Sequence, residues 1–168
     1  IPGLMRPSAS RGIIDRMAQA LLHDVSTRDS LPPGFVPASL AEIVVLSDFW
    51  SPLDEIAAMI GSLSASGARG VLLQVVDPAE ETFPYSGRVE FNEPEGAGTV
   101  IAGRAQNWKD DYTAKLKQHR DGIRAETARR GWLFSTHRTD RSAAELLLYL
   151  HQALAASREG SARSGWPA

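Results

Sequence analysis

The chain contains no cysteine among its 168 residues, which excludes disulfide bonds, a thiolate zinc site and a cysteine nucleophile. It also has little excess of charge of either sign, because 18 lysine and arginine residues against 20 aspartate and glutamate residues give a formal net charge of −2. A balance this close to neutral creates no field that would attract nucleic acid or anionic lipid, so we expect neither as a partner.

Long apolar runs are missing as well. No stretch approaches the roughly 18 to 20 apolar residues that span a bilayer, and the N-terminus lacks the residue order of a signal peptide. Together with the absence of cysteine, this predicts a cytoplasmic protein with no membrane segment in this part of the chain. The chain begins at Ile1 rather than at methionine, so we expect it to be a piece of a longer protein, and a membrane anchor could lie outside it.

Proline, glycine and serine divide the chain into three parts. They are frequent in residues 1–12, which we interpret as a lead-in loop, and small polar residues fill 157–168, which we expect to be a disordered tail. The part between them, 13–156, is long enough to bury a core and has the patterns of a single α/β domain.

Three apolar runs inside this domain have the composition of buried strands. They start at Glu42, Gly70 and Trp132 and consist mainly of β-branched and other large apolar residues, which is typical of parallel sheets. The first of them reads as a central strand buried on both faces. Ser51 as a cap and Pro52 in the first turn mark a helix between the first two runs. A strand, a helix and a strand in this order predict parallel strands with a right-handed crossover.

Helical periodicity predicts the elements that cover this sheet. Apolar residues recur every three or four positions in 13–24, in 108–130 and after Ser142. The buried side of the last helix is predicted to carry Leu146, Leu147, Leu150 and Leu154. Alternating residues around a glycine-rich turn predict a small hairpin at about 86–104. The expected fold is therefore α/β, with a mostly parallel, Rossmann-like sheet flanked by helices and a small inserted β-hairpin.

Polar residues follow each predicted strand, at the edge where such folds bind ligands. Ser47 and Asp48 end the first strand, Asp77 ends the second, and His137 and Asp140 follow the third. Asp48 has the oxygen chemistry of a magnesium ligand, although an aspartate in such a place also commonly satisfies loop amides. For Asp77, which precedes a proline, a turn is the favoured interpretation.

Other features also allow both a functional and a structural interpretation. Phe49 and Trp50, beside the carboxylate, either form a contact surface or cap the core. His137 with Asp140 has the pattern of a base and its orienting acid, and Ser47 would be the nucleophile, but no G-x-S-x-G elbow surrounds Ser47. The aromatic stripe that begins with Trp108 and Tyr112 is more typical of a core than of a ligand cage.

Several segments, taken in order, carry a family likeness. They are VVLSDFWSP, VVDPAEETFPYSGRVEF, the aromatic-spaced helix with Tyr112, and GWLFSTHRTD followed by a leucine-rich helix. This ordered set resembles the C-terminal part of the bacterial domain-of-unknown-function 58 family, over about residues 13 to 156. Members of that family look like von Willebrand factor type A domains.

The resemblance implies a metal-ion-dependent adhesion site at the carboxyl edge of the sheet. Such a site draws on an Asp-x-Ser-x-Ser loop, a threonine from a second loop and an aspartate from a third. The third has a counterpart here, Asp48, whereas the Asp-x-Ser-x-Ser motif is absent from this sequence. We therefore expect no cofactor in this chain, and magnesium at Asp48 only in a full-length protein that supplies the other ligands.

The resemblance also implies association with MoxR-type AAA+ ATPases, as an accessory component rather than as an enzyme. The first hypothesis is thus a non-enzymatic protein-interaction module whose docking edge is formed by Ser47, Asp48, Phe49 and Trp50. The alternative is a metal-assisted or serine hydrolase that uses Asp48, Asp77, His137 and Asp140. A third hypothesis is a folded remnant that forms a homodimer through an exposed sheet edge, because an unpaired strand is a template for association.

Overall fold

Three parallel strands form the sheet of the computed structural model, as the sequence predicts. The structure describes residues 5, 8–23, 31–32, 34–92 and 98–164. The strands pair in the order β1 (Glu42–Ser47), β2 (Arg69–Val76), β5 (Leu133–Arg138). Because all three run in the same direction, their carboxyl ends lie at one edge of the sheet, which confirms the shared edge expected for the candidate site.

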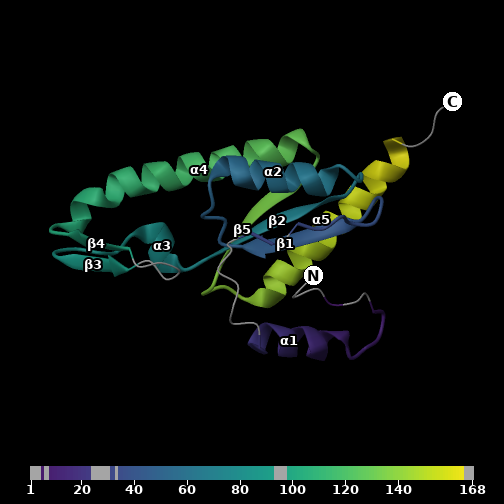
Figure 1. The fold of residues 1–168 in the computed structure, drawn as a ribbon, viewed down its shortest axis with the longest axis horizontal. Helices are drawn as coiled ribbons and strands as arrows, with labels where there is room; N and C mark the ends of the chain where they lie inside the picture. The colour runs from purple at the N-terminus through teal and green to yellow at the C-terminus, as the bar shows by residue number, and fades with distance from the viewer. Residues whose placement is uncertain (1–4, 6–7, 24–30, 33, 93–97, 165–168) are drawn as a thin grey trace.

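Helices cover both faces of this sheet (Figure 1). α2 (Leu53–Ser64) and α4 (Lys109–Arg129) lie side by side on one face, and α5 (Ala143–Ser164) lies on the other. α1 (Ile13–His23) lies on the same side of the sheet as α5. The predicted α/β class with a Rossmann-like parallel sheet is confirmed. No helix among the described residues has the length and apolar character needed to cross a membrane.

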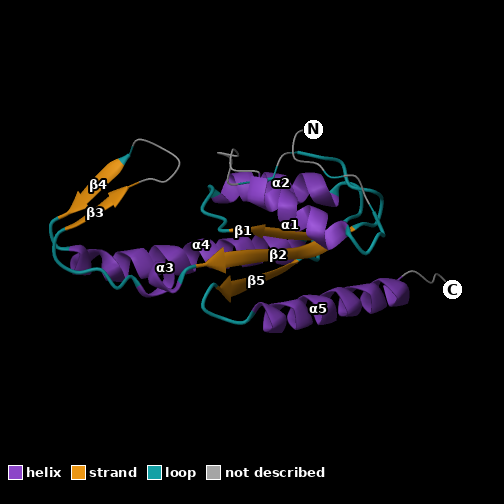
Figure 2. Ribbon diagram, turned by 90° about the horizontal axis from the view of Figure 1, so that it is seen from below, coloured by secondary structure: helices purple, strands orange, loops and turns teal. Residues whose placement is uncertain are grey.

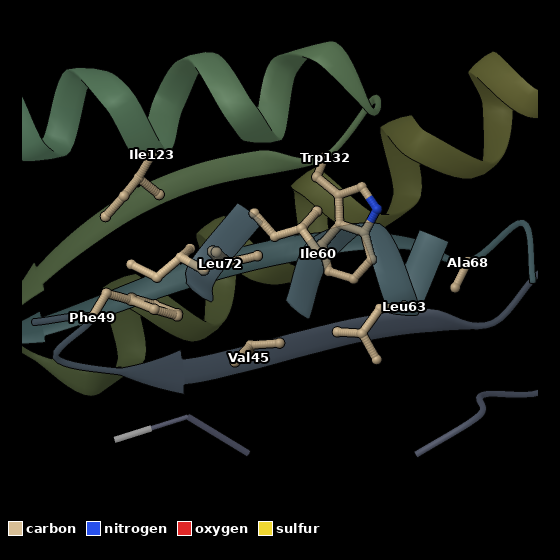
Figure 3. Close-up of a cluster of buried hydrophobic side chains, with 9 residues drawn as sticks. Val45, Phe49, Ile60, Leu63, Ala68, Leu72, Ile123 and Trp132 are labelled. Carbon is tan, nitrogen blue, oxygen red and sulfur yellow. The ribbon is translucent and has the colours of Figure 1, made fainter. Parts of the chain in front are cut away.

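The main core lies between the sheet and the helices α2 and α4 (Figure 3). β2 is the central strand, and its residues 70–74 are all buried. The core cluster consists of Val45, Phe49, Ile56, Ile60, Leu63, Ala68, Leu72, Ile123 and Trp132. Phe49 lies at the end of this cluster next to the carboxyl end of β1, where the candidate site begins.

A second, smaller core joins the predicted hairpin to the first part of α4. The hairpin consists of β3 (Val89–Asn92) and β4 (Thr99–Ala102), which pair antiparallel, while residues 93–97 of its turn lie outside the described residues. Figure 2 shows it beyond the edge of the main sheet, beside α4. The short helices α3 (Pro78–Thr82) and η1 (Ala105–Trp108) flank it. Its core holds Phe83, Ala102 and Ala105, with Val89, Phe91 and Tyr112 packed against them.

Two predictions about β1 and α2 are wrong in detail. β1 is an edge strand rather than a central one, and Leu46 keeps 59% of its surface exposed. A run of apolar residues indicates buried side chains, but it does not indicate the position of a strand in the sheet. Ser51 is not the cap of α2, because Pro52 occupies that position and no side-chain cap bond forms. The Pro52 carbonyl instead accepts from the N–H groups of Glu55 and Ile56.

The last helix differs from prediction in its length and in its buried face. Ser142 caps it, since the Ser142 hydroxyl accepts from the Ala144 N–H. α5 then continues to Ser164, so most of the segment predicted to be disordered is helical, and residues 165–168 lie outside the described residues. Alanine, arginine and glutamate in that segment favour a helix. Leu147, predicted on the buried side, is 65% exposed, whereas Leu146, Leu150 and Leu154 are half-buried.

Candidate functional site

The loop from Asp48 to Pro52 connects β1 to α2 at the carboxyl edge of the sheet. Side chains of the loop itself bind its backbone. The Ser47 hydroxyl accepts a hydrogen bond from the Phe49 N–H at 3.1 Å, and the Asp48 carboxylate accepts one from the Trp50 N–H at 3.3 Å. Asp48 therefore has the structural role that the sequence allows, because it satisfies a loop amide. The Asp48 side chain is exposed and lies beside Trp50.

Two side chains from other elements hold the carbonyl groups of this loop. Gln74 Nε2 of β2 donates to the Asp48 carbonyl at 2.7 Å. His119 Nε2 of α4 lies 2.7 Å from the Phe49 carbonyl, to which it donates as the Nε2–H tautomer. Since the loop is tied to the central strand and to the long helix at successive residues, its conformation is fixed by the core of the domain.

Phe49 anchors the loop from below. Its side chain is fully buried, and its backbone has a φ of 52°, in the left-handed region that residues with a Cβ seldom occupy. The interpretation of Phe49 as a cap on the core is thus the one that the structure favours, and the side chain is not available to a docking partner. Such a conformation costs on the order of 1 to 2 kcal/mol, which burial of the ring offsets.

Trp50 points the other way and lines an open groove on the surface of α4. The indole is 40% exposed and stacks on the His119 ring at 6.4 Å between centroids with 12° between planes. The groove has a volume of about 500 Å³. Its lining, which we name the Trp50 groove, consists of Trp50, Leu53, Tyr112, Lys115, Leu116, Gln118 and His119.

Tyr112 connects the Trp50 groove to the hairpin core. Its ring lies 6.4 Å from that of Trp50 and 4.9 Å from that of Phe83. Burial raises the pKa of the Tyr112 hydroxyl above its ordinary value, and the negative charge of Glu80 adds to this effect. The hydroxyl therefore stays protonated near neutral pH and is a hydrogen-bond donor beside the groove.

Behind the loop, a polar chain of side chains crosses the carboxyl edge of the sheet. Gln74 is fully buried, and its Oε1 accepts from Arg120 Nε at 2.7 Å. Arg120 Nη1 in turn lies 2.7 Å from Glu81 Oε1, and Arg138 Nε lies 3.9 Å from Glu81 Oε2. Because a buried amide is costly without partners, this chain explains why a polar residue is retained in the centre of the sheet.

The remaining candidate residues do not assemble into a hydrolase site. Ser47 pairs with Gln74, and Gln74 pairs with Thr136, so these three side chains lie on the same face of the sheet. Successive side chains of a strand alternate between faces, so His137 lies on the opposite face from Ser47. The two strands that carry them are separated by β2, which corresponds to about 10 Å. The structure thus does not bring the proposed nucleophile and base together.

The acids near His137 have structural partners. Asp140 accepts two hydrogen bonds from Arg138, at 3.0 and 2.7 Å, and these hold the pKa of Asp140 below its ordinary value. Asp77 caps α3 by accepting from the Ala79 N–H, and Glu80 completes a capping box on the Asp77 N–H. Asp77, for which a turn was the favoured interpretation, therefore starts a short helix.

The described residues do not form a complete magnesium site around Asp48. Among them, no group of three or more histidine, aspartate and glutamate side chains could hold a metal ion. Asp48 Oδ1 is also engaged by the Ser47 hydroxyl at 3.3 Å and by the Trp50 N–H. Asp48 and Ser47 would supply at most part of such a site, and the other ligands would have to come from elsewhere.

Three residues that support the loop are not predicted as site residues from the sequence: Gln74 and His119, which bond the loop directly, and Arg120, which acts through Gln74. One signal is visible, because Gln74 is the polar residue in the otherwise apolar run VLLQVV. His119 stands on the stripe of α4 that the periodicity assigns to the core, and Arg120 follows it. Their partners lie 26, 70 and 46 positions away in the sequence, so the spacing of residues does not reveal the contacts.

Comparison with known proteins adds a family match. A family model described as "Protein of unknown function DUF58" matches residues 6–122. The matched segment includes the loop at Asp48 and every residue of the Trp50 groove, and it ends within α4, before β5. No curated protein and no solved structure matches the chain.

Proposed function

The chain belongs to the DUF58 family of proteins of unknown function, and from this membership and the geometry of the loop we propose that it is a non-enzymatic protein-interaction module. Its docking surface is the Trp50 groove with Asp48 at the margin. Ser47 and Phe49, placed at the docking edge by sequence reasoning, instead support Trp50 from within the loop. The proposal retains the von Willebrand A-like character that the sequence suggests and a cytoplasmic location.

One observation carries this proposal, namely that a large aromatic side chain is exposed on a rigid support. Tryptophan is enriched among the residues that contribute most to protein–protein affinity. Trp50 is held by the buried Phe49 ring and by the bonds from Gln74 and His119, so little conformational entropy is lost when a partner covers it.

The chemistry of the groove suggests what the partner presents. Leu53 and Leu116 continue the apolar surface of Trp50, and Lys115 places a positive charge at the lining. A complementary partner offers an apolar side chain with a carboxylate close to it. Following the family resemblance, we propose a MoxR-type AAA+ ATPase as the partner.

The test is to measure the affinity of the chain for such an ATPase by biolayer interferometry. Trp50→Ala should weaken binding by about 30-fold or more, because truncating an anchor of this kind typically costs about 2 kcal/mol or more. Trp108→Ala is a matched control, since Trp108 is 41% exposed but packs on Phe91 of the hairpin. It should change the affinity by less than about threefold, which corresponds to a loss below about 1 kcal/mol.

Equal affinities of the Trp50→Ala variant and the original chain would reject the groove as the docking surface. Asp48→Ala provides a second reading, since it removes the carboxylate that accepts from the Trp50 N–H while the carbonyl bond to Gln74 stays. It should fold and bind more weakly than the original chain. If the original chain itself does not bind the ATPase, that partner is excluded.

A further inference from the structure

The helices on the two faces of the sheet differ in the apolar surface that they leave exposed. Among the described residues, α2 and α4 carry no large apolar side chain that is classed as exposed. The parts of α1 and α5 whose burial is described carry six aliphatic ones, with exposed fractions between 52% and 79%. These side chains, which we name the α1–α5 surface, are Ile14, Met17, Leu21, Leu22, Leu147 and Leu148.

The first part of α5 carries apolar side chains beyond the face that it turns to the sheet. Leu146, Leu150 and Leu154 lie on the side that faces the sheet and are half-buried. Leu147 and Leu148 lie one and two positions further round the helix and are 65% and 60% exposed. The apolar stripe of a helix normally marks the part of its surface that is covered. The sheet supplies one cover for α5, and the outer side requires another.

α1 carries an apolar face that none of the described residues covers. The helix has 11 residues, and helices shorter than about 12 to 15 residues are marginal in water without packing. Leu21 and Leu22 are 79% and 76% exposed, so no described part of the chain covers this face. α1 lies on the same side of the sheet as α5 (Figure 1), yet it leaves Leu147 and Leu148 exposed.

We propose that the α1–α5 surface is the interface of a homodimer, in which α1 of each copy packs on the outer side of α5 of the other. One chain carries both the apolar helix and the apolar surface that fits it, so a two-fold axis produces two identical contacts from a single patch. The interface is independent of the Trp50 groove, which lies on the α4 face of the sheet. Leu46 of the edge strand faces the α5 side, since its register partner Leu73 is outside the α2–α4 core, and it adds apolar surface there.

The apolar area that the α1–α5 surface exposes is close to the apolar area that a small homodimer interface buries. Burying one large aliphatic side chain removes roughly 60 to 120 Å² of apolar surface, so the exposed fractions of the α1–α5 surface in two copies amount to on the order of 700 Å². Stable interfaces bury about 1,200 to 2,000 Å², of which about 65% is apolar in homodimers. The side chains thus supply nearly the apolar share of a small homodimer interface.

Sedimentation equilibrium of the whole chain tests this proposal. We expect a mass near twice 18.2 kDa at micromolar concentrations. Met17→Glu with Leu21→Glu, and separately Leu147→Glu with Leu148→Glu, should each give a monomer that still unfolds cooperatively. Val100→Glu with Ile101→Glu is the control, because these residues of the hairpin are 56% and 51% exposed and should leave the dimer intact.

Mixing the two monomeric variants tests the pairing itself. The first variant keeps an intact α5 and the second an intact α1, so the mixture regains one of the two contacts and should form a heterodimer where neither variant alone associates. In a dimer in which α1 packs on α1 and α5 packs on α5, each contact of the mixture would still include one substituted helix, so no heterodimer would form. A monomeric original chain overturns the proposal, and so does a dimer that survives both double substitutions, which would point to edge-to-edge pairing of β1 instead.

Discussion

Replacing Gly70 by alanine should lower the free energy of unfolding by about 3 kcal/mol or more. Gly70 lies in the central strand opposite Ile43 of β1. A Cβ atom at Gly70 would lie 1.9 Å from the Ile43 carbonyl oxygen, far inside van der Waals contact. The obstacle is backbone, so the two strands must separate or shift, and overpacking of this kind reaches or exceeds the upper end of the usual range of about 1 to 3 kcal/mol. Urea unfolding followed by circular dichroism measures the loss.

Gly122→Ala is the matched control for this substitution. A Cβ atom there would lie 2.6 Å from Cδ2 of Leu53, which is the mobile end of a half-buried side chain. Alanine also favours a helix over glycine by about 1 kcal/mol, which offsets the adjustment of Leu53. We expect a net change within about 1 kcal/mol. If Gly70→Ala were no more harmful than Gly122→Ala, the close parallel pairing of β1 with β2 would be contradicted.

Replacing Phe49 by alanine should cost about 3 to 5 kcal/mol, the usual range for removing a fully buried phenylalanine. Phe49 has no exposed surface and belongs to the core cluster between the sheet and α2 (Figure 3). Its loss leaves a cavity under the loop and removes the anchor that fixes Trp50. The same unfolding experiment measures the stability, and a loss below about 1 kcal/mol would show that the ring does not occupy the core.

A comparison of Phe49→Gly with Phe49→Ala separates the effect of the backbone conformation from the effect of losing the ring, because both variants lack the ring. Elsewhere in a folded chain, glycine is less stable than alanine by about 0.5 to 1 kcal/mol. At a φ of 52° the order should reverse, because glycine adopts the left-handed conformation without the cost that a Cβ imposes. We therefore expect Phe49→Gly to be more stable than Phe49→Ala. The normal order, with alanine more stable, would contradict the left-handed backbone at Phe49.

Much of this fold is predictable from the sequence because its signals are local. The β-branched runs at Glu42 and Gly70 and the periodic segments between them indicate strands and helices that the structure contains. Parallel pairing then follows from the alternation of strand and helix. The position of β1 at the edge does not follow, because it depends on which strands lie beside it in space. The full length of α5 does not follow either, because small and polar residues occur both in disordered tails and in exposed helices.

The site is only partly predictable for a related reason. Asp48 and Trp50 are visible in the sequence because a carboxylate and an aromatic residue follow a strand at the functional edge. Whether Phe49 faces solvent or the core depends on its φ angle, which a sequence does not reveal for a residue other than glycine or proline. The supports from Gln74 and His119 depend on contacts between β2, α4 and the loop that exist only once the fold is complete.

Fluorine NMR of the chain labelled with 5-fluorotryptophan tests most directly the claim that a rigid loop presents Trp50 to a protein partner. The chain has four tryptophan residues, and single tryptophan-to-phenylalanine variants assign their resonances. On addition of the ATPase, we expect the Trp50 resonance to shift or broaden to saturation, while those of the buried Trp132 and of Trp108 at the end of η1 stay unchanged. A Trp50 resonance that remains unaffected while the ATPase is bound would contradict this account.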